Sequence, residues 1–217
     1  MMRSRKPFLP RSMPIRTFLP ACALTLTLAL AAPAGAVDGT ITINGEISDA
    51  TCKINGAEPP YNLMVTLPKI SSYALKSPND YAGATPFTIK ITDCPSTLSG
   101  QVRAYFEPGV TTDYDNGALY AYTTTTVGTT ETSIPSRVGA SKAEHIAFQL
   151  ANPDGVAITL GADVTAQTAN AATLQTVSGK TTKSATLRYL ARYVRTSAGT
   201  IAAGKLVSYV QYSIVYP

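Results

Sequence analysis

The C-terminal stretch Ala202–Pro217 most constrains the fold, because it has the composition of a β-strand and apolar side chains on both faces. Val, Ile and Tyr favour strands, and a strand that is apolar on both faces belongs inside a sandwich. One face carries Leu206, Val210, Tyr212, Ile214 and Tyr216, with Ser208 as its polar member. The sequence continues no further, so we expect this edge to be covered by a strand from elsewhere, since uncovered apolar edges attract other strands.

Residues 1–36 have the pattern of a secretory signal peptide. A basic start with Arg3, Arg5 and Lys6 precedes an apolar run from Phe18 to Ala32, and Ala34-Gly35-Ala36 offers a cleavage site. This leader contains five of the 18 Lys and Arg residues and none of the 13 Asp and Glu residues. The remaining 181 residues therefore carry 13 of each sign, which argues against nucleic-acid binding through a basic surface.

Two cysteines, Cys52 and Cys94, remain after the leader in a chain predicted to enter an oxidising compartment. They allow one intramolecular disulfide, which would close a loop of 43 residues. On the loop-entropy model such a cross-link stabilises by roughly 4 kcal/mol. The alternative is two unpaired buried thiols.

The rest of the chain predicts strands and turns, with no sustained helical period. Proline residues make 55–80 mostly irregular, and Asn116-Gly117 indicates a hairpin. An all-β sandwich is the fold class that fits. The predicted strands are 63–67, 86–94, 101–107, 145–150, 156–160 and 186–195, followed by one long strand at the C-terminus.

A second strand-like ribbon opens the chain after the leader. Val37, Gly39, Ile41 and Ile43 alternate with polar residues, and the strand pattern then continues through 45–54. This continuous run is longer than the five or six residues of a typical strand. Two interpretations stay open: an ordinary first strand of the domain, or a ribbon that projects away to pair elsewhere.

Four motifs resemble the subunits of type 1-like chaperone–usher fimbriae. They are Gly45-Glu-Ile-x-x-Ala-x-Cys52, Phe87-Thr-Ile-x-Ile-x-Asp-Cys94, Phe148-Gln-Leu-x-x-x-x-Gly155 and Ala191-Arg-Tyr193, and Tyr216 stands next to last as in that family. The match runs over nearly all of the chain after the leader. The Thr-rich segment 123–133 and a longer stretch before His145 depart from the family pattern.

The resemblance implies an incomplete immunoglobulin-like β-sandwich, 45–217, that lacks its last strand. A periplasmic chaperone would first supply that strand, and the N-terminal extension 37–44 of the next subunit would then replace it. Val37, Gly39, Ile41 and Ile43 would be the donor residues. Tyr212, Ile214 and Tyr216 would lie on the strand that the chaperone grips, with Leu206 and Val210 continuing the same groove. The implied partners are the chaperone, an outer-membrane usher and neighbouring subunits at the cell surface, with a host receptor as an indirect partner.

The residues for catalysis or metal binding are sparse. His145 is the one histidine, and no Gly-x-Ser-x-Gly motif accompanies it. Asp113-Tyr-Asp115-Asn-Gly117 resembles a calcium loop faintly, but Thr124 stands where the bidentate Glu should be, so we expect a turn. We predict no enzyme, no cofactor and no metal. The rivals to a shaft subunit are an adaptor or tip subunit that contacts a receptor through 108–136, and a monomeric secreted sandwich.

Overall fold

A computed structural model describes residues 41–47, 52–126 and 140–217. The predicted leader, with Val37 and Gly39, lies outside the described residues. The chain divides into two units, Met1–Glu46 and Ile47–Pro217. No helix among the described residues is long and apolar enough to cross a membrane.

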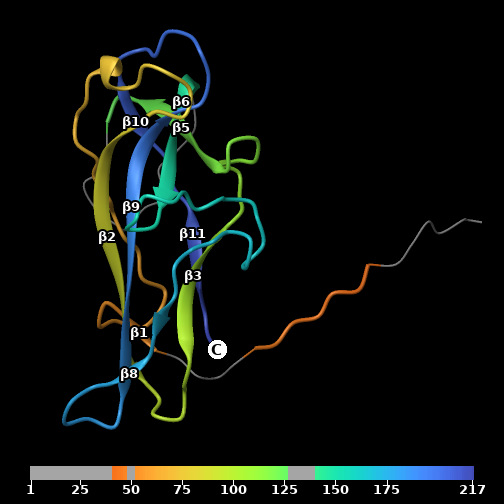
Figure 1. Cartoon of the computed structure of the whole chain (residues 1–217), viewed down its shortest axis with the longest axis vertical. Helices are drawn as coiled ribbons and strands as arrows, with labels where there is room; N and C mark the ends of the chain where they lie inside the picture. The colour runs from red at the N-terminus through yellow and green to blue at the C-terminus, as the bar shows by residue number, and fades with distance from the viewer. Residues whose placement is uncertain (1–40, 48–51, 127–139) are drawn as a thin grey trace, which may run out of the picture. The chain divides into compact units, whose positions relative to one another are not determined.

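The larger of two sheets runs in the order β1-β2-β9-β6-β5-β10, with β4 paired to β5 and β8 paired to β9 (Figure 1). All of its pairings are antiparallel, and the longest joins β2 to β9. Its strands are β1 (Lys53–Ile54), β2 (Tyr81–Cys94), β4 (Thr112–Asp113), β5 (Ala118–Thr124), β6 (Lys142–Ala151), β8 (Gln175–Thr176), β9 (Lys183–Arg195) and β10 (Lys205–Val207).

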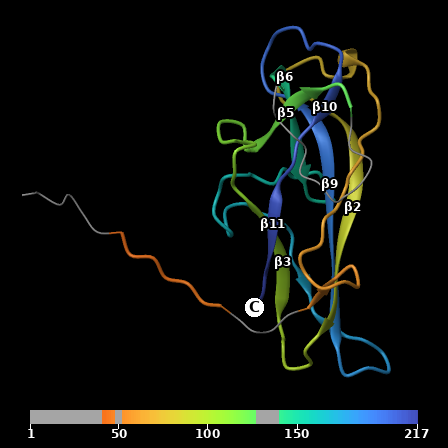
Figure 2. The same cartoon turned by 180° about the vertical axis from the view of Figure 1, so that it is seen from behind.

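The smaller sheet has three strands in the order β11-β3-β7. They are β3 (Gln101–Glu107), β7 (Ala172–Thr173) and β11 (Gln211–Val215), and a short 3₁₀ helix, η1 (Ser72–Ala74), lies outside both sheets. Figure 2 shows β11 beside β3. Strand β3 alternates buried and partly exposed residues, as expected for a strand with one face on a core.

The main core lies where inward-facing side chains of both sheets meet. Ile89 and Leu187 from the large sheet and Val102 and Phe106 from the small one are all buried in the same cluster. Tyr189 links the two layers, because its ring packs edge-on against Phe106 with centroids 5.4 Å apart and its hydroxyl donates to the Asn170 carbonyl at 2.8 Å. A buried tyrosine with a satisfied hydroxyl is a specific contact as well as an apolar one.

Three sequence predictions about strands are wrong. The C-terminal run is not one strand, because β10 pairs with β5 in the large sheet and β11 pairs with β3 in the small one. Residues 63–67 are extended but belong to no strand. Residues 156–160 form one isolated bridge and a hydrogen bond from Ile158 to Leu150 rather than a strand. The hairpin at Asn116-Gly117 is confirmed, since β4 and β5 pair across it.

Candidate functional site

Strand β11 lies at the edge of the small sheet. Its register with β3 runs from Gln211 opposite Glu107 to Val215 opposite Arg103, and no other described strand pairs with it. The inward-facing side chains are partly buried and pack against the main core: Val210, Tyr212, Ile214 and Tyr216. One edge of β11 is therefore fixed by a ladder, while the other has no ladder within the described chain.

A second row of apolar side chains comes from the extended segment 58–70. Over 61–68 the odd positions are partly buried against the same core, and the even positions are exposed. No backbone-to-backbone hydrogen bond between described residues involves this segment. Its apolar members are Tyr61, Leu63, Val65 and Leu67. Packing alone, rather than a ladder, thus holds most of the segment in place.

These two rows meet through one polar contact. The Tyr212 hydroxyl donates a hydrogen bond to the carbonyl of Tyr61 at 2.7 Å. Burial raises the pKa of Tyr212, with a smaller contribution from Tyr61, so the hydroxyl remains a protonated donor at neutral pH. We call the eight apolar residues of the two rows, with the unpaired edge of β11, the acceptor edge.

Contacts along β11 and at both of its ends hold this strand in place. The Thr111 hydroxyl donates to the carbonyl of Tyr209 at 2.6 Å, and the Ser213 hydroxyl donates to the Glu107 carboxylate at 2.6 Å. Pro217 packs directly over Gly100, where a Cβ atom would lie 2.6 Å from the proline ring. These contacts hold β11 against β3 and do not involve the opposite edge of β11.

The predicted site residues on the C-terminal run are not all brought together. Val210, Tyr212, Ile214 and Tyr216 share the acceptor edge, whereas Leu206 lies on β10 opposite Thr123 in the other sheet. The segment 58–70 was missed as part of this site. The sequence predicts a short strand at 63–67, but its local pattern does not indicate that this segment packs beside the C-terminal run.

The N-terminal segment 41–47 is extended and forms no strand with another part of the described chain. Ile41 and Ile43 are 90% and 89% exposed, and Ile47 is fully exposed. Large aliphatic side chains at this exposure are unusual, because burying one typically contributes about 1.5–3 kcal/mol. The predicted donor residues Val37 and Gly39 lie outside the described residues.

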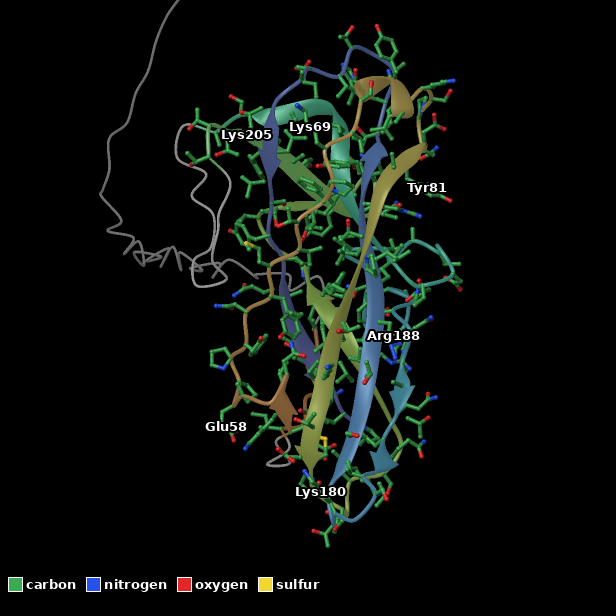
Figure 3. All side chains as sticks on the ribbon, turned by 90° about the vertical axis from the view of Figure 1, so that its left-hand side faces the viewer. Glu58, Lys69, Tyr81, Lys180, Arg188 and Lys205 are labelled. Atoms are coloured by element: carbon green, nitrogen blue, oxygen red, sulfur yellow. A yellow bond between two sulfur atoms is a disulfide. The ribbon has the colours of Figure 1, made fainter. Side chains whose placement is uncertain are left out.

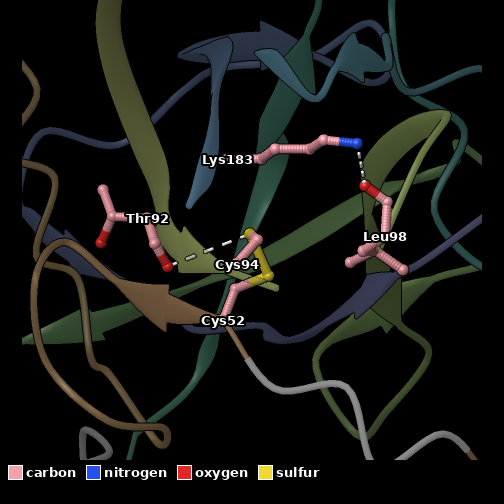
Figure 4. The surroundings of a disulfide bond; sticks show 5 residues. All are labelled: Cys52, Thr92, Cys94, Leu98 and Lys183. Atoms are coloured by element: carbon pink, nitrogen blue, oxygen red, sulfur yellow. Dashed lines mark hydrogen bonds between the residues drawn. A yellow bond between two sulfur atoms is a disulfide. The ribbon is translucent and has the colours of Figure 1, made fainter. Parts of the chain in front are cut away.

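The disulfide between Cys52 and Cys94 is present and fully buried (Figure 4). It joins the residue directly before β1 to the last residue of β2. Beside it, the Lys183 ammonium group donates to the carbonyl of Leu98 at 2.8 Å, which connects β9 to the loop before β3. The alternative of two unpaired thiols is therefore wrong.

His145, Asp113 and Asp163 are not part of the acceptor edge, and each forms a hydrogen bond with another side chain or with a backbone amide. His145 Nδ1 contacts the Ser197 hydroxyl at 2.8 Å at the start of β6. Asp113 accepts hydrogen bonds from the Asn116 side chain and from the Asp115 and Asn116 amides, which closes the predicted turn. Hydrogen bonds from the Ala166 amide and from Thr165 lower the pKa of Asp163. Within the described ranges, no group of three potential metal ligands occurs.

The sequence of this chain is similar to those of known fimbrial proteins. Residues 67–217 match the family profile described as Type-1 fimbrial protein, A (FimA). The chain is 46% identical over 202 residues to the serotype 3 fimbrial subunit of Bordetella pertussis strain Tohama I, spanning 90% of this chain and 95% of that relative. It is 40% identical over 205 residues to the serotype 2 fimbrial subunit of the same strain, spanning 94% and 99%.

Among solved structures, the fold is similar to a chain in the structure of a chaperone–usher pilus. The TM-score is 0.50 at 16% sequence identity, and the match covers 86% of this chain and 100% of the other. At that identity the likeness concerns the fold. It confirms the prediction of an all-β, immunoglobulin-like sandwich.

Proposed function

The chain belongs to the type-1 fimbrial protein family, and from this premise we propose that it is a shaft subunit that polymerises by donor-strand exchange. Members of this family are structural subunits and not enzymes, and they associate with other pilin subunits in a surface fimbrium. The proposal concerns the finer step, which is how one subunit holds the next.

The acceptor edge carries this proposal. An edge strand with unpaired backbone groups, flanked by partly buried apolar side chains, can bind an extended peptide through a ladder and side-chain contacts. Ile41 and Ile43 sit at alternate positions of an exposed extended segment, as such a peptide requires. Burying them on another copy would contribute on the order of 2–3 kcal/mol each. Val37 and Gly39 continue the same alternation in the sequence.

The same edge accounts for the other partners that we propose. Before assembly, a periplasmic chaperone would cover Tyr212, Ile214 and Tyr216 with a strand of its own, because an exposed apolar edge aggregates. An outer-membrane usher would then pass the subunit to the growing fimbrium. The signal-peptide pattern of residues 1–36 supports export through the periplasm.

A second candidate role is that of an adaptor or tip subunit that touches a host receptor. The loop before β5 supports it, because Val110 and Tyr114 are 62% and 64% exposed. The two roles differ in whose acceptor edge the N-terminal ribbon fits. A ribbon that fits its own chain indicates a shaft subunit, and one that fits only another subunit indicates an adaptor.

The test uses the chain from Val37 to Pro217 with Ile41→Asp, so that it cannot donate its own ribbon. A peptide spanning Val37–Ser48 is added, and thermal unfolding is followed with an Ile41→Asp peptide as the control. We expect the native peptide alone to raise the melting temperature strongly, because a ligand that binds only the folded state stabilises it.

Two other results would speak against the shaft role. A protein that is already stable and ignores the native peptide would contradict donor-strand exchange and favour a monomeric sandwich. An unstable protein that ignores its own peptide, but is stabilised by a ribbon peptide from another pilin, would support the adaptor role.

A further inference from the structure

One hydrogen bond crosses the acceptor edge. It joins the Tyr212 hydroxyl on β11 to the carbonyl of Tyr61 at 2.7 Å. Among the bonds between described residues, it alone engages the backbone of 58–70. The distance between segment 58–70 and β11 is therefore maintained by this bond and by side-chain packing.

The type of contact indicates how far apart the two sides are. Adjacent strands lie about 4.8 Å apart and are joined backbone to backbone. No backbone bond joins β11 to 58–70 in the described chain, and the connection is instead made at the far end of a tyrosine ring. A strand placed between them would require about two strand spacings, near 9.6 Å. A long, rigid side chain that reaches across is suited to a separation of that kind.

We propose that Tyr212 is a positioning residue, whose hydroxyl bond to Tyr61 holds segment 58–70 at the distance needed for one added strand before that strand arrives. This inference rests on the proposed donor-strand function. It adds a role for one hydroxyl group, namely to prepare the acceptor edge rather than to contact the donor.

Loss of the bond should allow the two apolar rows to approach each other. Leu63, Val65, Tyr212 and Ile214 all pack against the main core and are only partly buried, so mutual contact would bury the apolar area that they still expose. The segment has no ladder to resist this movement. A receptor whose binding-competent form is only partly populated binds with an apparent affinity reduced by that fraction.

The experiment measures binding rates of the Val37–Ser48 peptide to the Val37–Pro217 chain carrying Ile41→Asp. Tyr212→Phe is compared with the Tyr212-intact protein, and Tyr209→Phe serves as the matched control. Tyr209 stands three residues earlier, is not among the side chains packed against the main core, and its hydroxyl has no hydrogen bond to a described residue. We expect Tyr212→Phe to lower the association rate constant about three- to tenfold, in keeping with one neutral hydrogen bond, with the dissociation rate unchanged.

Para-aminophenylalanine at position 212 provides a rescue, because its amino group restores a donor at the end of the same ring. We expect it to recover most of the association rate. An unchanged or faster association in Tyr212→Phe, or an equal loss in Tyr209→Phe, would overturn the positioning role and leave donor-strand binding intact. Absence of peptide binding to the Tyr212-intact protein would instead overturn the donor-strand function and this inference with it.

Discussion

At the scale of single residues, the most unusual group is a buried arginine on the outer face of the large sheet. Arg192 is 4% exposed and forms no ion pair with a described carboxylate. Its Nε and Nη2 atoms donate to the Gln149 side-chain carbonyl at 2.9 and 2.7 Å, and its guanidinium lies 3.7 Å from the centre of the Tyr81 ring. Burial lowers the pKa of Arg192. Neutral and aromatic partners thus take the place of a counter-ion.

We predict that Arg192→Lys lowers the free energy of unfolding by about 1–3 kcal/mol, because hydrogen bonds to a charged group are among the stronger ones. Lysine keeps the charge but cannot present a planar fork to Gln149 and stack on Tyr81 together. Urea denaturation measures the change. Arg188→Lys is the control, since Arg188 is an exposed arginine on the same strand and the same face (Figure 3). Equal effects of the two substitutions would contradict the prediction.

At the scale of elements, the sequence predicted strands well where alternation and propensity agreed. Residues 101–107 form β3 as predicted, and 186–195 lie within β9. The failures have a common cause, because a strand needs a partner as well as a pattern. Segment 58–70 alternates without a ladder, and the C-terminal run changes partner between Val207 and Gln211. Local periodicity carries no information about a pairing partner that is distant in sequence. The sequence therefore could not predict that segment 58–70 and β11 form the two sides of the acceptor edge.

The disulfide gives a prediction for the first element. It ties the residue directly before β1, a strand of two residues, to the last residue of β2 across a sequence separation of 42. We expect the Cys52→Ala, Cys94→Ala double variant to lose roughly 4 kcal/mol of unfolding free energy on the loop-entropy model. Guanidinium denaturation of the oxidised chain and the double variant measures this. Reductant should destabilise the oxidised chain alone, and a double variant of equal stability would show that β1 needs no cross-link.

At the scale of the whole molecule, the proposed function gives each subunit one donor segment and one acceptor edge. A contact of this kind is head-to-tail, and it continues into a filament unless the rotation closes a ring. The proposed function therefore predicts that the two activities can be separated by mutation. One variant would lack the donor, and another would lack the acceptor.

We predict that chains with Ile41→Asp and chains with Ile214→Asp each remain monomeric, and that mixing them gives a dimer that does not grow. The first chain can only accept a strand, and the second can only donate one. Light scattering after size-exclusion chromatography measures the masses. Circular dichroism checks that Ile214→Asp is folded, since Ile214 is partly buried. Long polymers from the mixture would contradict a single donor and a single acceptor per chain.

The change of sheet within the C-terminal run also has a mechanical consequence. Residues 205–207 are bonded to the large sheet and 211–215 to the small one, so three residues of backbone connect the two ladders. A tensile force applied to β11 by a strand bound beside it would pass to β3 through hydrogen bonds. Through the covalent chain it would also reach β10, which is hydrogen-bonded to β5. Both layers of the sandwich would share the load, and neither could be peeled away without straining the other.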